Sequence, residues 1–216
     1  MHRRIPLLFL ITVLFAQHLF CQAASDPFDS KAMDSVAAKI MEEYKIVGIS
    51  AAVMHKGVVK LAKTYGKRSL ETGEVVEPTT QFAVGSVTKQ FTCACIFLLQ
   101  EDGKLSVHDK VAKYFPSLTR ANDITLLDLM NHTSGYPDYY PLDFVDRRMM
   151  KPITLDDLIK EYAGGKLDFE PGSLWSYSNT GYIILGRVIE KITGEKFATF
   201  LERRILKPLG LANTSF

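Results

Sequence analysis

Residues 82–91 read FAVGSVTKQF, a stretch in which an apolar run meets a helical pattern. The apolar run ends at Gly85, and helical spacing of apolar residues begins at Ser86 and continues to about Glu101. Ser86 is therefore expected at a helix N-terminus, where free backbone N–H groups and the helix dipole favour developing negative charge. Lys89 follows three residues later, which on a helix places both side chains on one face, with Cβ atoms about 5–6 Å apart.

Ser86 and Lys89 have the chemistry of a nucleophile and its proton acceptor. A serine hydroxyl is a weak nucleophile until a neighbouring group takes its proton, and a lysine amine can do so in its neutral form. The same residues are also consistent with a surface serine that caps a helix and a solvated lysine in its first turn. This short motif does not decide between the two interpretations.

A second polar set, Tyr177-Ser178-Asn179, lies on a turn that leads into another helical pattern. A tyrosine at this position can relay a proton between Ser86 and a leaving group. The side-chain amide of Asn179 can donate a hydrogen bond to a substrate carbonyl. The alternative is that Tyr177 packs with Trp175 and Asn179 only caps the helix.

The sequence His132-Thr133-Ser134-Gly135 suggests a serine–histidine pair, which we reject. Residues so close in sequence do not hold nucleophile–base geometry, and Ser134 lacks the Gly-x-Ser-x-Gly elbow. We expect instead a buried polar turn that is hydrogen-bonded to its own backbone. The tyrosines that follow, Tyr136, Tyr139 and Tyr140, either line a cleft or cover the core.

The first 23 residues have the composition of a secretory signal peptide. Two arginines precede an apolar run that is short for a membrane span, and Cys21 and Ala23 are small residues that fit cleavage after Ala23. A lipid-anchored start at Cys21 is the alternative, although Phe20 is bulky for such a site. We therefore expect a signal peptide at residues 1–23, no stable membrane span after its removal, and a secreted protein of the bacterial periplasm.

Charge and cysteine content exclude several classes of function. Lys and Arg number 26 and Asp and Glu 24, but two arginines lie in the predicted signal peptide, so the mature chain is formally neutral. Nucleic acid and an anionic membrane surface are therefore not expected as partners. Cys93 and Cys95 point to different faces of the predicted helix, so we interpret both as small core residues without a disulfide. His and Cys residues lack metal-ligand spacing and no phosphate loop follows a strand, so no metal or cofactor is predicted.

The remaining periodicities predict a helix, one hairpin and then a mostly helical run. A two-stranded hairpin is not stable by itself, and no further strands are evident after residue 80. The expected elements are a helix at 29–45, strands at 47–54 and 58–65, a loop at 67–80, and further helices at 126–131, 154–163, 179–193 and 195–206.

Three blocks follow one another along the chain: VGSVTK at 84–89, LLDLMNHTSG at 126–135, and EPG at 170–172 with YSNTGYIILG at 177–186. Together they resemble the serine β-lactamase-related family, which includes class C β-lactamases, D-Ala-D-Ala carboxypeptidases and related esterases. Each block alone is weak or moderate, but their order and the 91 residues between the serine and the tyrosine make the resemblance specific. It extends from about residue 30 to the end of the chain.

The resemblance implies an α/β (α+β) fold of the β-lactamase and penicillin-binding-protein type. The fold would have a helical region and an antiparallel sheet of which only the N-terminal hairpin is present. The resemblance also implies an acyl-enzyme mechanism, in which Ser86 attacks the carbonyl of an amide, β-lactam or ester. Lys89 and Tyr177 would share the proton transfers, and Asn179 would orient the substrate. The oxyanion hole of the family uses the backbone N–H of the serine, here Ser86, and one from a strand near the C-terminus.

The chain departs from the family after Asn179. Family members carry Lys-Thr/Ser-Gly or His-x-Gly on a strand beside the serine, whereas Lys191-Ile192-Thr193-Gly194 has the wrong spacing and a helical context. We therefore expect residues 24–216 to be a β-lactamase-related serine hydrolase domain that is C-terminally incomplete. The expected partner is a small-molecule or peptide substrate: a peptidoglycan peptide, a β-lactam or an ester. The alternatives are a non-catalytic penicillin- or peptidoglycan-binding protein and an inactive truncated fragment.

Overall fold

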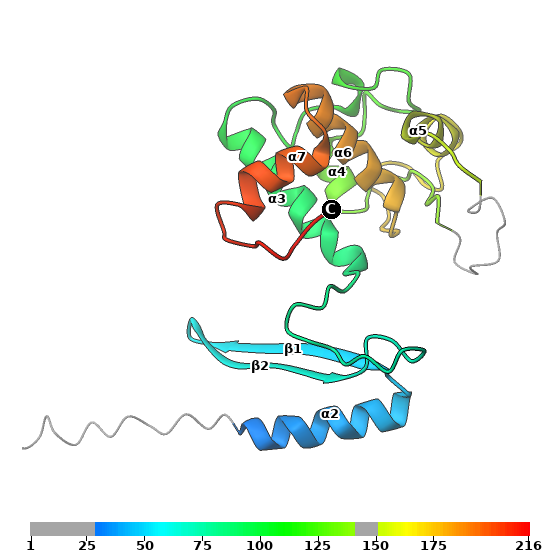
Figure 1. Cartoon of the computed structure of the whole chain (residues 1–216). Helices are drawn as coiled ribbons and strands as arrows, with labels where there is room; N and C mark the ends of the chain where they lie inside the picture. Colours follow the sequence, from blue (N-terminus) through cyan, green and yellow to red (C-terminus); the bar gives the residue numbers. More distant parts are fainter. Residues whose placement is uncertain (1–28, 141–150) are drawn as a thin grey trace, which may run out of the picture. The chain divides into compact units, whose positions relative to one another are not determined.

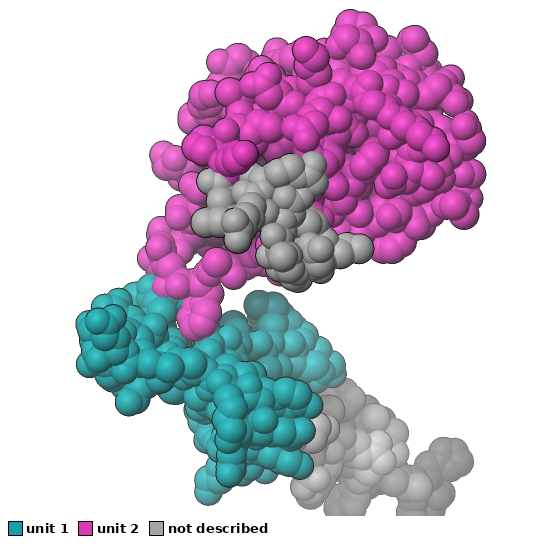
Figure 2. All heavy atoms as spheres, turned by 90° about the vertical axis from the view of Figure 1, so that its right-hand side faces the viewer, with its two compact units in different colours: residues 1–80 teal, residues 81–216 magenta. Residues whose placement is uncertain are grey.

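The computed structural model describes residues 29–140 and 151–216, so the predicted signal peptide at residues 1–23 lies outside the described part. The chain divides into two compact units, residues 1–80 and 81–216 (Figures 1 and 2). All four predicted site residues belong to the second unit. Within the described ranges, no helix is both long enough and apolar enough to cross a membrane.

The first unit is a helix followed by a hairpin, as predicted. Helix α2 spans Ser30–Tyr44, and the Asp29 side chain caps it by accepting hydrogen bonds from two backbone N–H groups. Strands β1 (Gly48–His55) and β2 (Val58–Gly66) pair antiparallel across a two-residue turn in which both residues have positive φ, a conformation that suits the twist of a hairpin. These two strands make up the only sheet among the described residues.

The second unit is built around helix α6, which packs against α3, α4, α5 and α7 (Figure 1). One face of α6 is fully buried at helical spacing, which removes its apolar side chains from water and supplies the main driving force for packing this unit. The elements of the unit are η1 (Gly85–Val87), α3 (Thr88–Glu101), η2 (Val111–Lys113), α4 (Leu126–Met130), α5 (Leu155–Ala163), α6 (Asn179–Thr193), α7 (Phe197–Leu201) and the π-helical turn η4 (Glu202–Leu206).

Local capping signals set the bounds of these helices where they were predicted. Thr125 and Asp128 form a reciprocal capping box at the start of α4. Thr154 caps α5 by accepting a hydrogen bond from the backbone N–H of Asp157. Gly194 ends α6 in the left-handed conformation, so the predicted helix at 179–193 is confirmed at both ends.

Two predicted helix starts are wrong. Ser86 is not the first residue of an α-helix but lies in the 3₁₀ turn η1, and α3 begins at Thr88. Gly85 has a φ of +51°, so the chain turns sharply before it can enter a regular helix. The last helix begins at Phe197 rather than residue 195, and its final turn widens into a π-helix.

The His-Thr-Ser-Gly turn is the buried polar turn that the sequence predicts. Ser134 is buried, and its Oγ accepts a hydrogen bond from the backbone N–H of Tyr136. The backbone of this turn also binds the segment 168–176: carbonyl oxygens of the turn accept N–H groups of Asp168, Gly172 and Ser176 at 2.8–3.1 Å. The turn therefore supports the loop that carries Tyr177.

We predict that Gly135→Ala destabilises the protein. Gly135 has a φ of +81°, and a Cβ there would lie 2.3 Å from the backbone oxygen of Phe169. The positive φ alone costs a residue with a side chain about 1–2 kcal/mol, and the clash with backbone adds to it. Urea denaturation should show a loss of at least about 2 kcal/mol in the free energy of unfolding.

Gly186→Ala is the matched control, because Gly186 lies within α6 and an added Cβ there would meet no atom within 4 Å. It should raise the free energy of unfolding by about 0.5–1 kcal/mol. Equal stability of the two variants would contradict the proposed constraint at Gly135.

Candidate active site

The four residues predicted from sequence meet at one place in the second unit. Ser86 lies in η1, Lys89 in the first turn of α3, Tyr177 in the loop before α6, and Asn179 at the first position of α6. Ser86 Oγ lies 2.6 Å from the Tyr177 hydroxyl oxygen, although the residues are 91 positions apart. Lys89 Nζ donates to the same Oγ at 3.3 Å. The serine hydroxyl thus has both an amine and a phenol within hydrogen-bond reach.

Lys89 is held by more than the serine. Its Nζ donates to Asn179 Oδ1 at 2.6 Å, a bond that ties the first turn of α3 to the first turn of α6. The same nitrogen lies over the rings of Tyr177 and Tyr182, 4.7 and 5.2 Å from their centroids. A carbonyl oxygen and two aromatic faces all stabilise a cation, so the surroundings of Lys89 suit an ammonium group.

Asp138 is a site residue that the sequence did not reveal. Its Oδ1 accepts the backbone N–H of Asn179 at 2.9 Å, and its Oδ2 accepts the side-chain N–H of Asn179 at 3.0 Å. A carboxylate only accepts hydrogen bonds, so it requires the NH₂ end of the amide and turns Oδ1 of Asn179 toward Lys89. Asp138 also caps α6 from outside the helix, since Ser178 at the N-cap makes no side-chain capping bond.

No local signal in the sequence points to this role of Asp138. It lies 41 residues before Asn179, between Pro137 and Tyr139 in the aromatic loop.

Two tyrosines of that loop take different roles among the two that the sequence predicts. Tyr136 is buried in the core and donates to the backbone oxygen of Thr119, whereas Tyr139 lines a cavity beside the site.

The pKa of Tyr177 is lowered below its ordinary value of 10.0. Partial burial acts to raise this pKa, but the interaction with Lys89, the hydrogen bond with Ser86 and the positive charge of Lys89 together outweigh it. The N-termini of α3 and α6 lie at the same place and add positive potential. The site therefore stabilises the phenolate form of Tyr177 relative to that of a tyrosine in water.

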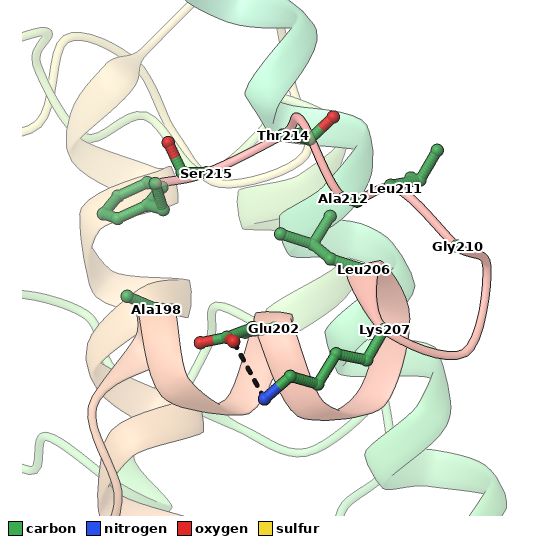
Figure 3. Close-up of a pocket in the computed structure, with 10 residues that line it drawn as sticks. Ala198, Glu202, Leu206, Lys207, Gly210, Leu211, Ala212, Thr214 and Ser215 are labelled. Atoms are coloured by element: carbon green, nitrogen blue, oxygen red, sulfur yellow. Dashed lines mark ion pairs between the residues drawn. The ribbon is translucent and has the colours of Figure 1, made fainter.

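A cavity of about 490 Å³ opens beside Lys89 and Asn179. Its walls are mainly apolar and aromatic and include Tyr139, Tyr182 and Phe197, a composition typical of small-molecule sites. A second cavity, of about 570 Å³, lies between α7, η4 and the last residues of the chain and shares Ala198 and Phe216 with the first (Figure 3). An ion pair between Glu202 and Lys207 forms part of its wall, and none of the four predicted site residues lines it.

No group of three or more His, Cys, Asp or Glu side chains in the described ranges is arranged to hold a metal ion. Cys95 is buried and Cys93 half-buried, with Cys93 Sγ 3.3 Å from the Tyr182 hydroxyl, and both are free thiols in the second unit. This agrees with their interpretation as small packing residues.

Comparison with known proteins shows that this chain is similar to β-lactamases and penicillin-binding proteins. A family model described as Beta-lactamase matches residues 33–216. Protein flp of Staphylococcus aureus (strain COL) is 30% identical over 189 residues, which cover 85% of this chain and 38% of the relative. Penicillin-binding protein 4* of Bacillus subtilis (strain 168) is 36% identical over 150 residues, covering 68% and 32%. The chain thus spans less than half the length of either relative.

Solved structures agree with this grouping. An octameric penicillin-binding protein homologue from Pyrococcus abyssi superposes with a TM-score of 0.74 at 31% identity, covering 86% of this chain and 44% of that one. A class C β-lactamase in complex with cefoxitin gives a TM-score of 0.72 at 27% identity, covering 83% and 49%. The predicted fold class, that of β-lactamases and penicillin-binding proteins, is confirmed.

We predict that Asp138→Ala destabilises the second unit by about 1–2 kcal/mol, because it removes the cap of α6 and leaves the Asn179 amide without its acceptor. Asp138→Asn is the matched comparison. Its amide oxygen can still accept the backbone N–H of Asn179, so its loss should be less than about 1 kcal/mol. Chemical denaturation measures both, and an alanine variant as stable as the wild type would exclude the capping role.

Proposed function

The chain belongs to the β-lactamase family, and from that premise we propose that it is a serine hydrolase that forms an acyl-enzyme on Ser86. One observation carries the proposal: Ser86 Oγ lies 2.6 Å from the Tyr177 oxygen and 3.3 Å from Lys89 Nζ. A hydroxyl held between a phenol of lowered pKa and an amine has the geometry of an activated nucleophile.

In the acylation step, Ser86 Oγ forms a bond to the carbonyl carbon of an amide, β-lactam or ester, and its proton passes to the phenolate oxygen of Tyr177. The tetrahedral oxyanion then collapses, the bond to the leaving nitrogen or oxygen breaks, and the proton moves from Tyr177 to the leaving atom. A water molecule attacks the acyl-enzyme and gives a proton to the same phenolate. Ser86 takes that proton as the carboxylic acid departs.

Lys89 supports these transfers through its charge. As an ammonium group it stabilises the Tyr177 phenolate and donates a hydrogen bond to Ser86 Oγ. Asn179 uses Oδ1 to hold Lys89 and one N–H to hold Asp138, which leaves its second amide N–H for a substrate carbonyl. The backbone N–H of Ser86 is the proposed first donor to the oxyanion.

The substrate class follows from the chemistry of the site. An acyl-enzyme mechanism suits β-lactams, peptides and esters, and the cavity of about 490 Å³ beside Lys89 and Asn179 is large enough for a substrate side chain. A peptidoglycan peptide would require export, which the basic and apolar composition of residues 1–23 supports.

We predict that Ser86→Ala abolishes covalent labelling by a fluorescent penicillin and by a fluorophosphonate. The alanine side chain has no oxygen to acylate, so intact-protein mass spectrometry should show no adduct. The protein for this test should be produced from its complete gene, with the exposed Ser117→Ala as a control that is labelled like the wild type. Equal labelling of wild type and Ser86→Ala would refute the proposed function.

We predict that Lys89→Met slows acylation by about 10²–10⁴-fold and changes its pH dependence. Removing the positive charge raises the pKa of Tyr177, because the interactions with Lys89 are what lower it. The rise of the rate with increasing pH should therefore shift to higher pH in the variant. The acylation rate is measured from pH 5 to pH 10. A Lys89→Met variant that is slower at every pH, but whose rate rises at the same pH as that of the wild type, would contradict this role of the charge.

A further inference from the structure

His132 holds the chain on both sides of Tyr177. Its backbone oxygen accepts the N–H of Ser176 at 3.1 Å, and its ring Nδ1 accepts the N–H of Ser178, also at 3.1 Å. These two donors are the immediate neighbours of Tyr177 in the sequence. The backbone and the side chain of one residue therefore fix the peptide segment that presents the phenol to Ser86.

The ring of His132 also fixes the orientation of the Tyr177 ring. The two rings are stacked, with centroids 4.6 Å apart and planes at 29°. The Trp175 ring meets the imidazole edge-on, with ring centroids 6.0 Å apart, and the centroid of the Tyr182 ring lies 5.2 Å from that of the imidazole. The imidazole is thus packed among three aromatic side chains, one of which carries the oxygen beside Ser86.

His132 has a backbone conformation that suits few residues. Its φ is +61°, in the left-handed region, which costs most residues with a side chain about 1–2 kcal/mol and which Asn, Asp and His adopt more often than the others. The residue at position 132 must therefore meet three requirements: it adopts this conformation, accepts a hydrogen bond from a backbone N–H, and stacks on an aromatic ring. Asparagine satisfies the first two and phenylalanine only the third.

We propose that His132 is a positioning residue that sets the location and ring orientation of Tyr177, and that it does so only with Nδ1 unprotonated. This inference rests on the proposed function, because its effect on rate is exerted through Tyr177. A hydrogen bond from Ser178 needs a lone pair on Nδ1, so the ring proton of the neutral form is on Nε2. A doubly protonated imidazolium has no such lone pair, so its formation breaks the bond.

The groups around the imidazole act in opposite directions on this protonation. Burial lowers the pKa of His132 below its ordinary value of 6.5, and the charge of Lys89 on α3 lowers it further. The carboxylate of Asp138 acts against them, because a nearby negative charge favours the protonated ring. The other titratable groups that face the ring are the phenols of Tyr177 and Tyr182. The neutral form is therefore kept at neutral pH and is lost only as the pH falls through a pKa that lies below 6.5.

Two substitutions separate the acceptor from the ring. His132→Asn keeps an acceptor oxygen at the place of Nδ1 and tolerates the positive φ, so its acylation rate at pH 7.5 should stay within about 5-fold of the wild type. His132→Phe keeps a ring but leaves the Ser178 N–H without its acceptor, so its rate should fall about 10- to 100-fold. The rates are measured with a fluorescent penicillin on protein from the complete gene, after thermal unfolding has verified that each variant is folded.

The pH profile of acylation tests the protonation step independently. Where the pH falls through the lowered pKa of His132, a plot of log rate against pH should become steeper by one proton in the wild type than in His132→Asn, because only the wild type loses its acceptor. The exposed His108→Asn serves as the control and should keep the wild-type profile. A His132→Asn profile that parallels the wild type would overturn the proposal, as would a folded His132→Phe variant with a rate within about 3-fold of the wild type.

The ring nitrogens give a readout that does not depend on activity. ¹⁵N spectra of the histidine rings at pH 7.5, assigned with His132→Asn, should show an unprotonated Nδ1 and a protonated Nε2 for His132. An Nδ1–H tautomer would overturn the proposal even in an active enzyme. If the wild type is not acylated by any probe, the proposed function fails, and these spectra still decide how His132 binds the Tyr177 segment.

Discussion

The hydrogen bond from Lys89 Nζ to Asn179 Oδ1 is the interaction on which the site depends, because it joins the first turns of α3 and α6. Two helix N-termini and an ammonium group meet there, and each carries positive potential. Such an arrangement is unfavourable unless negative charge offsets it. Asp138 supplies a fixed carboxylate at the start of α6, and the Tyr177 oxygen, whose pKa is lowered, is the second group that can carry negative charge.

The packing of helix α6 also determines where the site residues lie. Helix α6 is held in place by its fully buried face, and Asn179 is its first residue. Its N-terminus therefore cannot shift without disturbing the core of the second unit. Because α6 begins at the site, Asn179 is a rigid reference. Lys89 is hydrogen-bonded to Asn179 directly, and Tyr177 is joined to it through Ser178, the one residue between them. Rigid support of this kind is what a positioned nucleophile requires.

The sequence was most informative where structure is set locally. The bounds of α6 and the capping box of α4 follow from residues within one turn of each helix end. The start of α3 could not be predicted in the same way, because the sharp turn at Gly85 takes Ser86 into a 3₁₀ turn. The proximity of Ser86 and Lys89 was expected from their spacing, whereas the meeting of this pair with Tyr177 and Asn179 was made specific only by the resemblance to a family.

The roles of Asp138 and His132 could not be predicted from local sequence patterns, because both depend on hydrogen bonds between segments more than 40 residues apart. The His-Thr-Ser-Gly turn illustrates the difference: its chemistry suggested a nucleophile, but a buried Ser134 cannot meet a substrate. What the turn offers is backbone acceptors and an imidazole nitrogen aimed at the loop before α6. Polar groups in such a loop need partners, and a turn that supplies them also determines where the phenol lies.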